Sequence, residues 1–246
     1  MVELVVDAGG PPVHAGRLGG AVVDPSVVLT DGLVALRRGL PTWLPDRRRA
    51  SGNVRVRPDA AIRRAARGRA VTGRGLDRRI TERPSLSVTD LRAGDGSGAV
   101  PTRAGARLDL RLPPGADPGP VLDRLRRTVR CVTPPGVRTD VRVLARSTGL
   151  RLVSPPWVRS ALGDAARTGF GRPVVYLRSG GGIPAVADLR AVFGRDPVLL
   201  GLGTPAGNAH GPDEHLDLPG WHRSIRLCTA LLGDLARRAP TPELTR

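Results

Sequence analysis

Lysine is absent from this chain, and cysteines and aromatic residues are scarce. All 39 basic side chains are therefore arginines, and they exceed the 22 acidic ones to give a formal net charge of +17 over 246 residues. Two cysteines exclude both a disulfide framework and a site of four thiolates. Because aromatics make up only 2% of the residues, a core has to be built from valine, leucine and alanine.

Long apolar runs are missing as well. No stretch approaches the ~20 apolar residues that span a bilayer, and the opening MVELVVDAGG lacks the regions of a secretory signal. Apolar residues still make up 40% of the chain, which is enough for a packed core. We therefore expect a cytoplasmic protein with one large or two ordinary domains and no membrane partner.

The arginine excess favours nucleic-acid binding, because guanidinium groups release counterions from phosphates. However, the arginines are scattered over the whole chain, and few aromatics are available to stack on bases. We interpret the excess as a coding bias and expect only non-specific contact with nucleic acid.

Residues 1–147 show the order strand, helix, strand, strand, helix, strand. Asp24-Pro25 and Asp117-Pro118 each predict a helix start, with a capping carboxylate followed by proline. Apolar alternation predicts the strands Glu3–Asp7, Ser85–Leu91, Ala104–Leu112 and Arg138–Leu144. This order predicts a split βαβ (ferredoxin-like) domain, a four-stranded antiparallel sheet with two helices on one face. The stripe of Val28, Leu29, Leu33 and Leu36 is expected to pack on that sheet.

An arginine-rich segment at about residues 39–84 interrupts this domain. It contains Arg47-Arg48-Arg49 and Arg63-Arg64 among many glycines and prolines. We interpret it as a long surface excursion, partly helical or disordered, with a functional basic patch as the alternative.

Residues 148–246 alternate helices with short apolar strands, which is typical of a parallel sheet. Helices are predicted after Ser154-Pro155 and near Pro219, and strands at Pro173–Leu177 and Pro197–Leu202. On the last helix one buried face is predicted from the spacing of Trp221, Ile225, Cys228, Leu232 and Leu235, with His222 facing solvent. Two strands cannot cover their own faces, so this part is expected to be an incomplete α/β domain. Cys131 and Cys228 are predicted to be small core residues.

Three segments carry residues suited to chemistry. Arg178 precedes the glycines Gly180, Gly181 and Gly182, and such a turn can bind a carboxylate or simply be a tight connection. His210 lies in a loop with acidic neighbours and is a candidate metal ligand; the alternative is a polar loop that caps the last helix. His14 lies among glycines between the first strand and the first helix, where a lone histidine is usually structural.

Four segments, in this order, carry a family resemblance: VHAGRLGGAVVDP, AVPTRAGARLDLRLPPGADP, RSGGGIP and HGPDEHLDLP. Together they resemble the two-zinc metallohydrolases that include aminoacylase, acetylornithine deacetylase, succinyl-diaminopimelate desuccinylase, carnosinase-type dipeptidases and glutamate carboxypeptidase. The resemblance covers nearly the whole chain, and Gly98 and Gly182 depart from the family pattern. It implies that residues 1–147 form the lid, or dimerisation domain, and that 148–246 form the closing part of a zinc-binding catalytic domain.

The resemblance also implies roles for single residues. His14 would reach across a homodimer to stabilise the oxyanion in the partner's site. Arg178 with Gly180, Gly181 and Gly182 would hold the carboxylate of an N-acyl amino acid or dipeptide. His210 would be the last zinc ligand.

The family's early H-x-D pair, bridging aspartate and adjacent glutamates precede the lid and have no counterpart in these 246 residues. We therefore expect a truncated hydrolase without activity alone, whose amino-terminal half is a separate chain, lost, or hidden by a misplaced start codon. The alternatives are a non-catalytic dimerisation or carboxylate-binding module and, less favoured, an arginine-rich nucleic-acid binder.

Overall fold

The computed structural model describes residues 1–44, 54–66, 68–180 and 182–238. They group into two compact units, which are described separately. The first comprises described residues of Met1–Ala50, Arg78–Arg151 and Ser179–Ala187, and the second those of Ser51–Asp77, Leu152–Arg178 and Asp188–Arg246. The predicted domain boundary at residue 147 stays a prediction.

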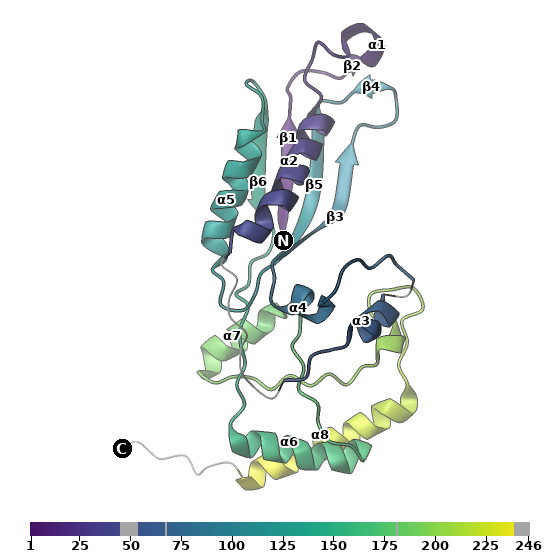
Figure 1. Cartoon of the computed structure of the whole chain (residues 1–246), viewed down its shortest axis with the longest axis vertical. Coiled ribbons are helices and arrows are strands. Elements are labelled where there is room, and N and C mark those ends of the chain that lie inside the picture. Colours follow the sequence, from purple (N-terminus) through teal and green to yellow (C-terminus); the bar gives the residue numbers. More distant parts are fainter. Residues whose placement is uncertain (45–53, 67, 181, 239–246) are drawn as a thin grey trace, which may run out of the picture. The chain divides into compact units, whose positions relative to one another are not determined.

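The first unit is built on a four-stranded antiparallel sheet. Its strands are β1 (Val2–Asp7), β3 (Ser85–Ala93), β5 (Arg103–Arg111) and β6 (Arg138–Val143), in the order β3-β5-β1-β6. The helices α2 (Pro25–Gly39) and α5 (Pro118–Cys131) cover one face of the sheet (Figure 1). The predicted split βαβ fold is confirmed.

Both helices begin as their sequences predict. The carboxylate of Asp24 accepts a hydrogen bond from the Ser26 amide at 2.8 Å, and that of Asp117 accepts one from the Gly119 amide at 2.9 Å. Each cap satisfies a backbone donor that the helix itself leaves unpaired, and proline follows in the first turn.

Strand alternation separates a core face from a solvent face. Leu4 of β1, Leu108 of β5 and Leu125 of α5 are fully buried, together with Leu29 and Leu36 of α2. The opposite face of the sheet carries ion pairs between neighbouring strands, such as Arg107 with Glu3. The helix-covered face is therefore the core, and the other face is a charged surface.

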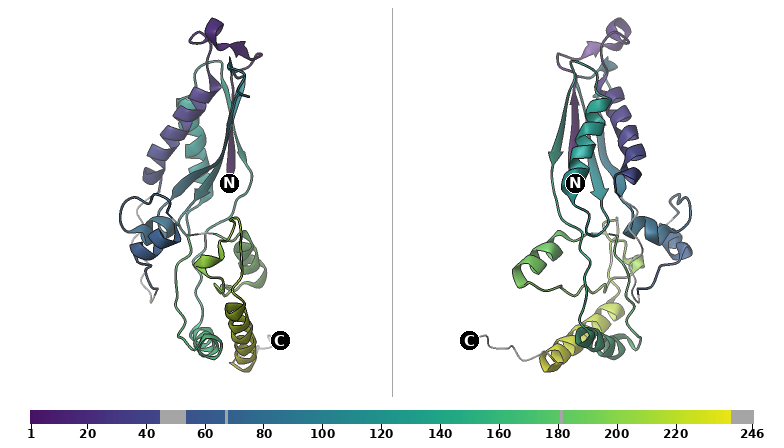
Figure 2. Two further views of the ribbon diagram at one scale, coloured as in Figure 1. Left: turned by 90° about the vertical axis from the view of Figure 1, so that its right-hand side faces the viewer. Right: turned by 60° about the vertical axis from the view of Figure 1, so that its left-hand side comes forward.

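Small elements lie at one end of this sheet. The two-residue strands β2 (Val13–His14) and β4 (Ala99–Val100) pair with each other, and α1 (Ala15–Leu18) follows directly (Figure 2). Strand β1 reaches this end at Asp7, whereas Ser85 and Val143 lie at the other end of the sheet. His14 is thus remote from the strand ends at which the chain enters and leaves the sheet.

The second unit contains a pair of packed helices, α6 (Pro156–Phe170) and α8 (Leu218–Arg238). Val158, Leu162 and Ala165 are buried as predicted. The predicted cap at Ser154 is wrong: α6 begins one residue later, and its N-cap Pro155 has no side-chain hydrogen bond to offer.

The predicted buried face of α8 is correct only in part: Cys228 and Leu235 are partly buried against the α6–α8 core. Trp221, Ile225 and Leu232 are exposed, and Ser224, Leu227 and Leu231 are buried instead. The packing of α8 on α6 determines which face of α8 is buried. Gly169 of α6 lets α8 approach so closely that an added Cβ would lie 2.7 Å from the Leu227 Cβ. Small Ser224 fits this interface by donating its hydroxyl to the Gly220 carbonyl.

The two predicted strands of the second unit are wrong as well. Residues 173–177 and 197–202 are not strands, and among the described residues their one ladder contact is a parallel bridge between Leu177 and Arg55. Val175, Leu177 and Leu199 remain exposed. Apolar strands of this kind are stabilised by neighbours on both sides, and the described residues supply none beyond that bridge.

The described part of the arginine-rich segment is partly helical, as predicted. It contains the short helix η1 (Leu40–Thr42), α3 (Asp59–Ala65) and α4 (Leu76–Thr81), and Arg47-Arg48-Arg49 lie outside the described residues. The Asp59 carboxylate accepts hydrogen bonds from the amides of Gly75 and Leu76. Asp77 is 3% exposed and pairs with Arg57 at 2.6 Å, so this part is not simply a surface excursion.

The remaining elements are α7 (Pro184–Phe193) and the short helix η2 (Pro205–Gly207). Within the described ranges, none of the helices combines the length and apolar character that crossing a bilayer requires. Cys228 is half-buried, as predicted, but Cys131 is exposed, because it is the last residue of α5 rather than part of its packed stripe.

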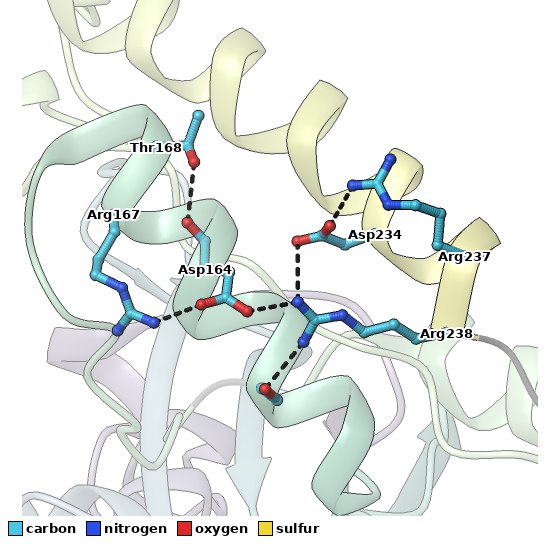
Figure 3. Close-up of polar contacts among 7 residues, drawn as sticks. Asp164, Arg167, Thr168, Asp234, Arg237 and Arg238 are labelled. Carbon is cyan, nitrogen blue, oxygen red and sulfur yellow. Dashed lines mark hydrogen bonds and ion pairs between the residues drawn. The ribbon is translucent and has the colours of Figure 1, made fainter.

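A polar cluster joins α6 to α8 (Figure 3). Asp164 on α6 accepts hydrogen bonds from Arg167 on the same helix and, at 2.7 Å, from Arg238 on α8. Arg238 also donates to the Ser160 hydroxyl at 2.9 Å. Hydrogen bonds from Arg238 and then Arg167 hold the pKa of Asp164 below its usual range.

The Asp164→Asn substitution is expected to lower stability slightly at neutral pH, because the cluster is exposed to solvent. Since the folded-state pKa of Asp164 is lowered, its contribution is present above the ordinary aspartate pKa and disappears as the pH falls through the folded value. The difference in urea unfolding midpoint between the variant and the unaltered protein should therefore disappear as the pH is lowered through the acidic range. Asp188→Asn, at an exposed α7 position, is the control; a difference that persists at strongly acidic pH contradicts the prediction.

Candidate functional site

His14 is exposed and caps the short helix α1. Its backbone is extended, at φ −65° and ψ 121°, and its Nδ1 accepts a hydrogen bond from the Gly16 amide at 3.0 Å. Pairing of His14 with Ala99 and of Val13 with Val100 fixes the strand from which the ring projects. The ring is therefore presented to solvent by a locally ordered support.

The loop between β1 and His14 is tied down by its own contacts. The Ala8 amide donates to the Thr102 carbonyl, and the Thr102 hydroxyl donates to the Gly10 carbonyl, both at 3.0 Å. A hydrogen bond from the Gly9 amide to Asp7, reinforced by Arg103 and Arg138, lowers the pKa of Asp7. Asp7 is thus held as an anion that anchors the end of the sheet nearest to His14.

The two described glycines after Arg178 differ in their surroundings. An added Cβ at Gly180 would lie 2.3 Å from the Ile80 carbonyl oxygen, whereas one at Gly182 would meet nothing within 4 Å. Gly180 therefore permits a close backbone approach, and Gly182 lines open space. Gly181 lies outside the described residues, and Arg178, which is half-buried, has interactions of its own.

His210 lies in a self-contained polar loop. The Gly207 carbonyl accepts a hydrogen bond from the His215 amide at 2.9 Å, which closes the loop. Asn208, His210 and Asp213 adopt left-handed conformations, with φ of 55°, 62° and 57°. Within the described residues no other non-glycine residue has a positive φ, and such concentrated strain is typical of functional loops.

The same loop also supports in part the alternative that it is a polar loop capping the last helix. Asp217 caps α8, because its carboxylate accepts a hydrogen bond from the Gly220 amide at 2.8 Å. Glu214 instead accepts one from the His210 backbone amide at 3.4 Å, so its carboxylate contacts the loop rather than the helix.

A catalytic zinc normally takes three protein ligands. No group of three histidine, cysteine or acidic side chains in the described part of the chain lies close enough to hold a metal ion. His210 is exposed, and the H-x-D sequence His215–Asp217 does not complete such a group. These residues therefore do not fit a two-zinc centre by themselves.

The candidate residues are divided between the two units. His14, Gly180 and Gly182 belong to the first unit, and Arg178 and His210 to the second. Sequence reasoning missed Gly16, whose amide positions His14, although its place two residues after an extended histidine was an available capping signal.

Comparison with known proteins identifies the first unit. The sequence pattern of the peptidase dimerisation domain, M20_dimer, matches residues 1–136. The chain belongs to this family. No curated protein sequence matches the chain.

Solved structures extend the similarity of this dimerisation-domain protein to its second unit. Human carnosine dipeptidase 1 superposes with a TM-score of 0.79 at 17% identity over 96% of this chain. The di-peptidase Dug1p from Saccharomyces cerevisiae gives 0.76 at 16% over 97%, and the M20 family metallo-carboxypeptidase Sso-CP2 from Sulfolobus solfataricus gives 0.74 at 22% over 94%. The chain covers 54%, 54% and 56% of these proteins, respectively, and so spans about half their length. At such identities the likeness is one of fold.

Proposed function

We propose that this chain forms the lid and the closing part of the catalytic domain of a metallohydrolase that cleaves an amide bond in a small carboxylate-bearing substrate. The observation that carries the proposal is the similarity of fold over 94–97% of the chain to proteins named as dipeptidases and a carboxypeptidase. A dipeptide or an N-acyl amino acid has the free carboxylate that Arg178 and the Gly180–Gly182 turn would bind.

His210 would contribute one metal ligand to this enzyme. Zinc, when bound, would supply an activated water for attack on the amide. Because no group of three possible ligands comes together among the described residues, the proposal takes the other ligands and the general base from residues outside this sequence, in a longer chain or in a separate one. A cytoplasmic location stays a prediction.

A homodimer formed through the lid is part of the proposal, since the first unit belongs to a dimerisation-domain family. We assign the interface to the side of α2 and the edge strand β3. Val27 on α2 and Leu91 on β3 are 56% and 59% exposed, and β3 has a free edge for antiparallel pairing with its copy.

The other edge of the sheet is unsuited to this contact. There Arg124, Arg127 and Arg130 of α5 are exposed, and so are Arg138 and Arg142 of β6. Arg138 and Arg142 are paired with Asp7 and Asp140, but across a twofold axis the arginines of α5 would face their copies as like charges. In such a dimer His14 would act in the partner's site, where the family resemblance implies that it stabilises the oxyanion.

The test is hydrolysis of a panel of dipeptides and N-acyl amino acids with zinc added. The 246-residue protein alone should show no turnover, and zinc-dependent turnover by it would overturn the need for outside ligands. An assembly that adds the missing ligands should hydrolyse at least one substrate and lose activity on His210→Ala. If an assembly that contains bound zinc hydrolyses none of these substrates, the hydrolase proposal is wrong.

A non-catalytic dimerisation module is the second candidate, favoured by the lack of a complete metal-binding group among the described residues. It predicts a folded dimer that retains little zinc after dialysis. Stoichiometric binding of two ions to residues 1–246 would exclude this candidate.

A further inference from the structure

Gly16 holds the ring of His14 by its backbone amide, and this contact fixes where the ring carries its proton. A backbone N–H can only donate, so Nδ1, which lies 3.0 Å from the Gly16 nitrogen, has to present a lone pair. The single proton of the neutral imidazole is then on Nε2.

The ring fits this position because residue 16 has no side chain. A Cβ at Gly16 would lie 3.0 Å from Cε1 and 3.3 Å from Nδ1 of His14, which is tighter than ordinary van der Waals contact. The imidazole thus lies directly against the backbone of residue 16. Any side chain there would displace the ring and lengthen the hydrogen bond.

Nε2 points away from this support. In the described part of the chain the His14 ring makes no hydrogen bond besides the one from Gly16, and the side chain is exposed. Among the described residues no carboxylate accepts the Nε2 proton, so the N–H is available to an acceptor that arrives from outside the unit.

We infer that the Gly16 amide locks His14 as the Nε2–H tautomer, which makes the ring a preset neutral hydrogen-bond donor for a developing oxyanion. This inference rests on the oxyanion role proposed for His14. An oxyanion is best stabilised by donors that are oriented before the reaction, because no reorganisation is then needed. His14 donates to substrate, and Gly16 is a positioning residue that acts through it.

Nuclear magnetic resonance of ¹⁵N-labelled residues 1–246 tests the inference without any catalysis. We expect a coupling through the hydrogen bond between the Gly16 amide nitrogen and His14 Nδ1, with the ring proton on Nε2 alone. The inference would be wrong if the ring carried its proton on Nδ1, carried protons on both nitrogens, or exchanged one proton between them. It would also be wrong if the coupling were absent at neutral pH.

Two alanine variants provide the matched comparison. Gly16→Ala should abolish the coupling, whereas Arg17→Ala, one residue further along α1, should leave it unchanged. Loss of the coupling in both variants would mean that α1 had unfolded. His14→Asn then decides, because its shorter side chain can still cap the helix and should keep the Gly16 amide as protected as it is in the unaltered protein. Loss of that protection would contradict the capping geometry.

Kinetics of the assembled enzyme separate this inference from the proposed function. His14→Asn should lower kcat by roughly 10²–10³ with little change in KM, because a transition-state donor is lost. Gly16→Ala should also lower kcat and leave KM little changed. If kcat is unchanged although the coupling is lost, the contact between Gly16 and His14 is only structural. An inactive assembly with an intact coupling would reject the hydrolase proposal and leave the tautomer in place.

Discussion

The Leu91→Arg substitution is expected to dissociate the proposed homodimer into monomers. Leu91 lies on the edge strand β3 and is 59% exposed in the single chain, so the fold of the first unit should tolerate the change. In a twofold dimer the substitution occurs twice, and each copy loses buried apolar surface and places a charge in the contact. A loss of about 3 kcal/mol corresponds to a roughly hundredfold rise in the dimer Kd.

Sedimentation or light scattering over a range of concentrations measures this shift. Val27→Arg on α2 should have the same effect, because the interface is assigned to both elements. Val143→Arg is the matched control: this valine is 42% exposed but lies on β6, at the arginine-bearing edge. If the Val143 variant dissociates and the Leu91 variant stays dimeric, the interface lies at the other edge of the sheet.

Features with a local cause were predictable from the sequence. Asp24-Pro25 and Asp117-Pro118 marked their helix starts because a cap and a proline act within the first turn. The alternation around Leu108 gave the buried face of β5, since side chains on a strand point to opposite faces. Together these signals were sufficient for the fold of the first unit.

Features that depend on distant partners were not predictable in this way. Trp221, Ile225 and Leu232 have the right spacing for a buried face, yet the close approach at Gly169 selects Leu227 and Leu231. The apolar segments 173–177 and 197–202 have the composition of central strands, but a strand forms only where its neighbours pair with it. Local apolar content cannot supply that information.

In the candidate site, too, local features were predictable from the sequence and features that depend on contacts were not. The position of His14 in a motif indicated its importance, whereas its tautomer depends on a contact with Gly16 that only coordinates reveal. His210 was recognised by its acidic neighbours, but its left-handed backbone was not signalled, because histidine is not a residue that demands this conformation.

Gly169→Ala is expected to destabilise the second unit, although alanine normally stabilises a helix relative to glycine. The new Cβ would lie 2.7 Å from both the Arg223 carbonyl oxygen and the Leu227 Cβ, and 2.9 Å from the Leu227 nitrogen. Two of these atoms belong to the backbone of α8, so the contact cannot be relieved by a side-chain rotation. Overpacking of this kind costs about 1–3 kcal/mol.

The same substitution at Gly163, about one and two-thirds turns earlier on α6, is expected to have the opposite sign. There a Cβ would meet only the end of the Arg167 side chain, at 3.9 Å, so helix propensity alone should raise stability by about 0.5–1 kcal/mol. Urea unfolding followed by tryptophan fluorescence, to which Trp157 of the α6–α8 core contributes, compares the two variants. Because both changes add one methyl group to one helix, opposite shifts can arise only from the packing of α8, and shifts of equal sign would show that the two helices do not approach closely at Gly169.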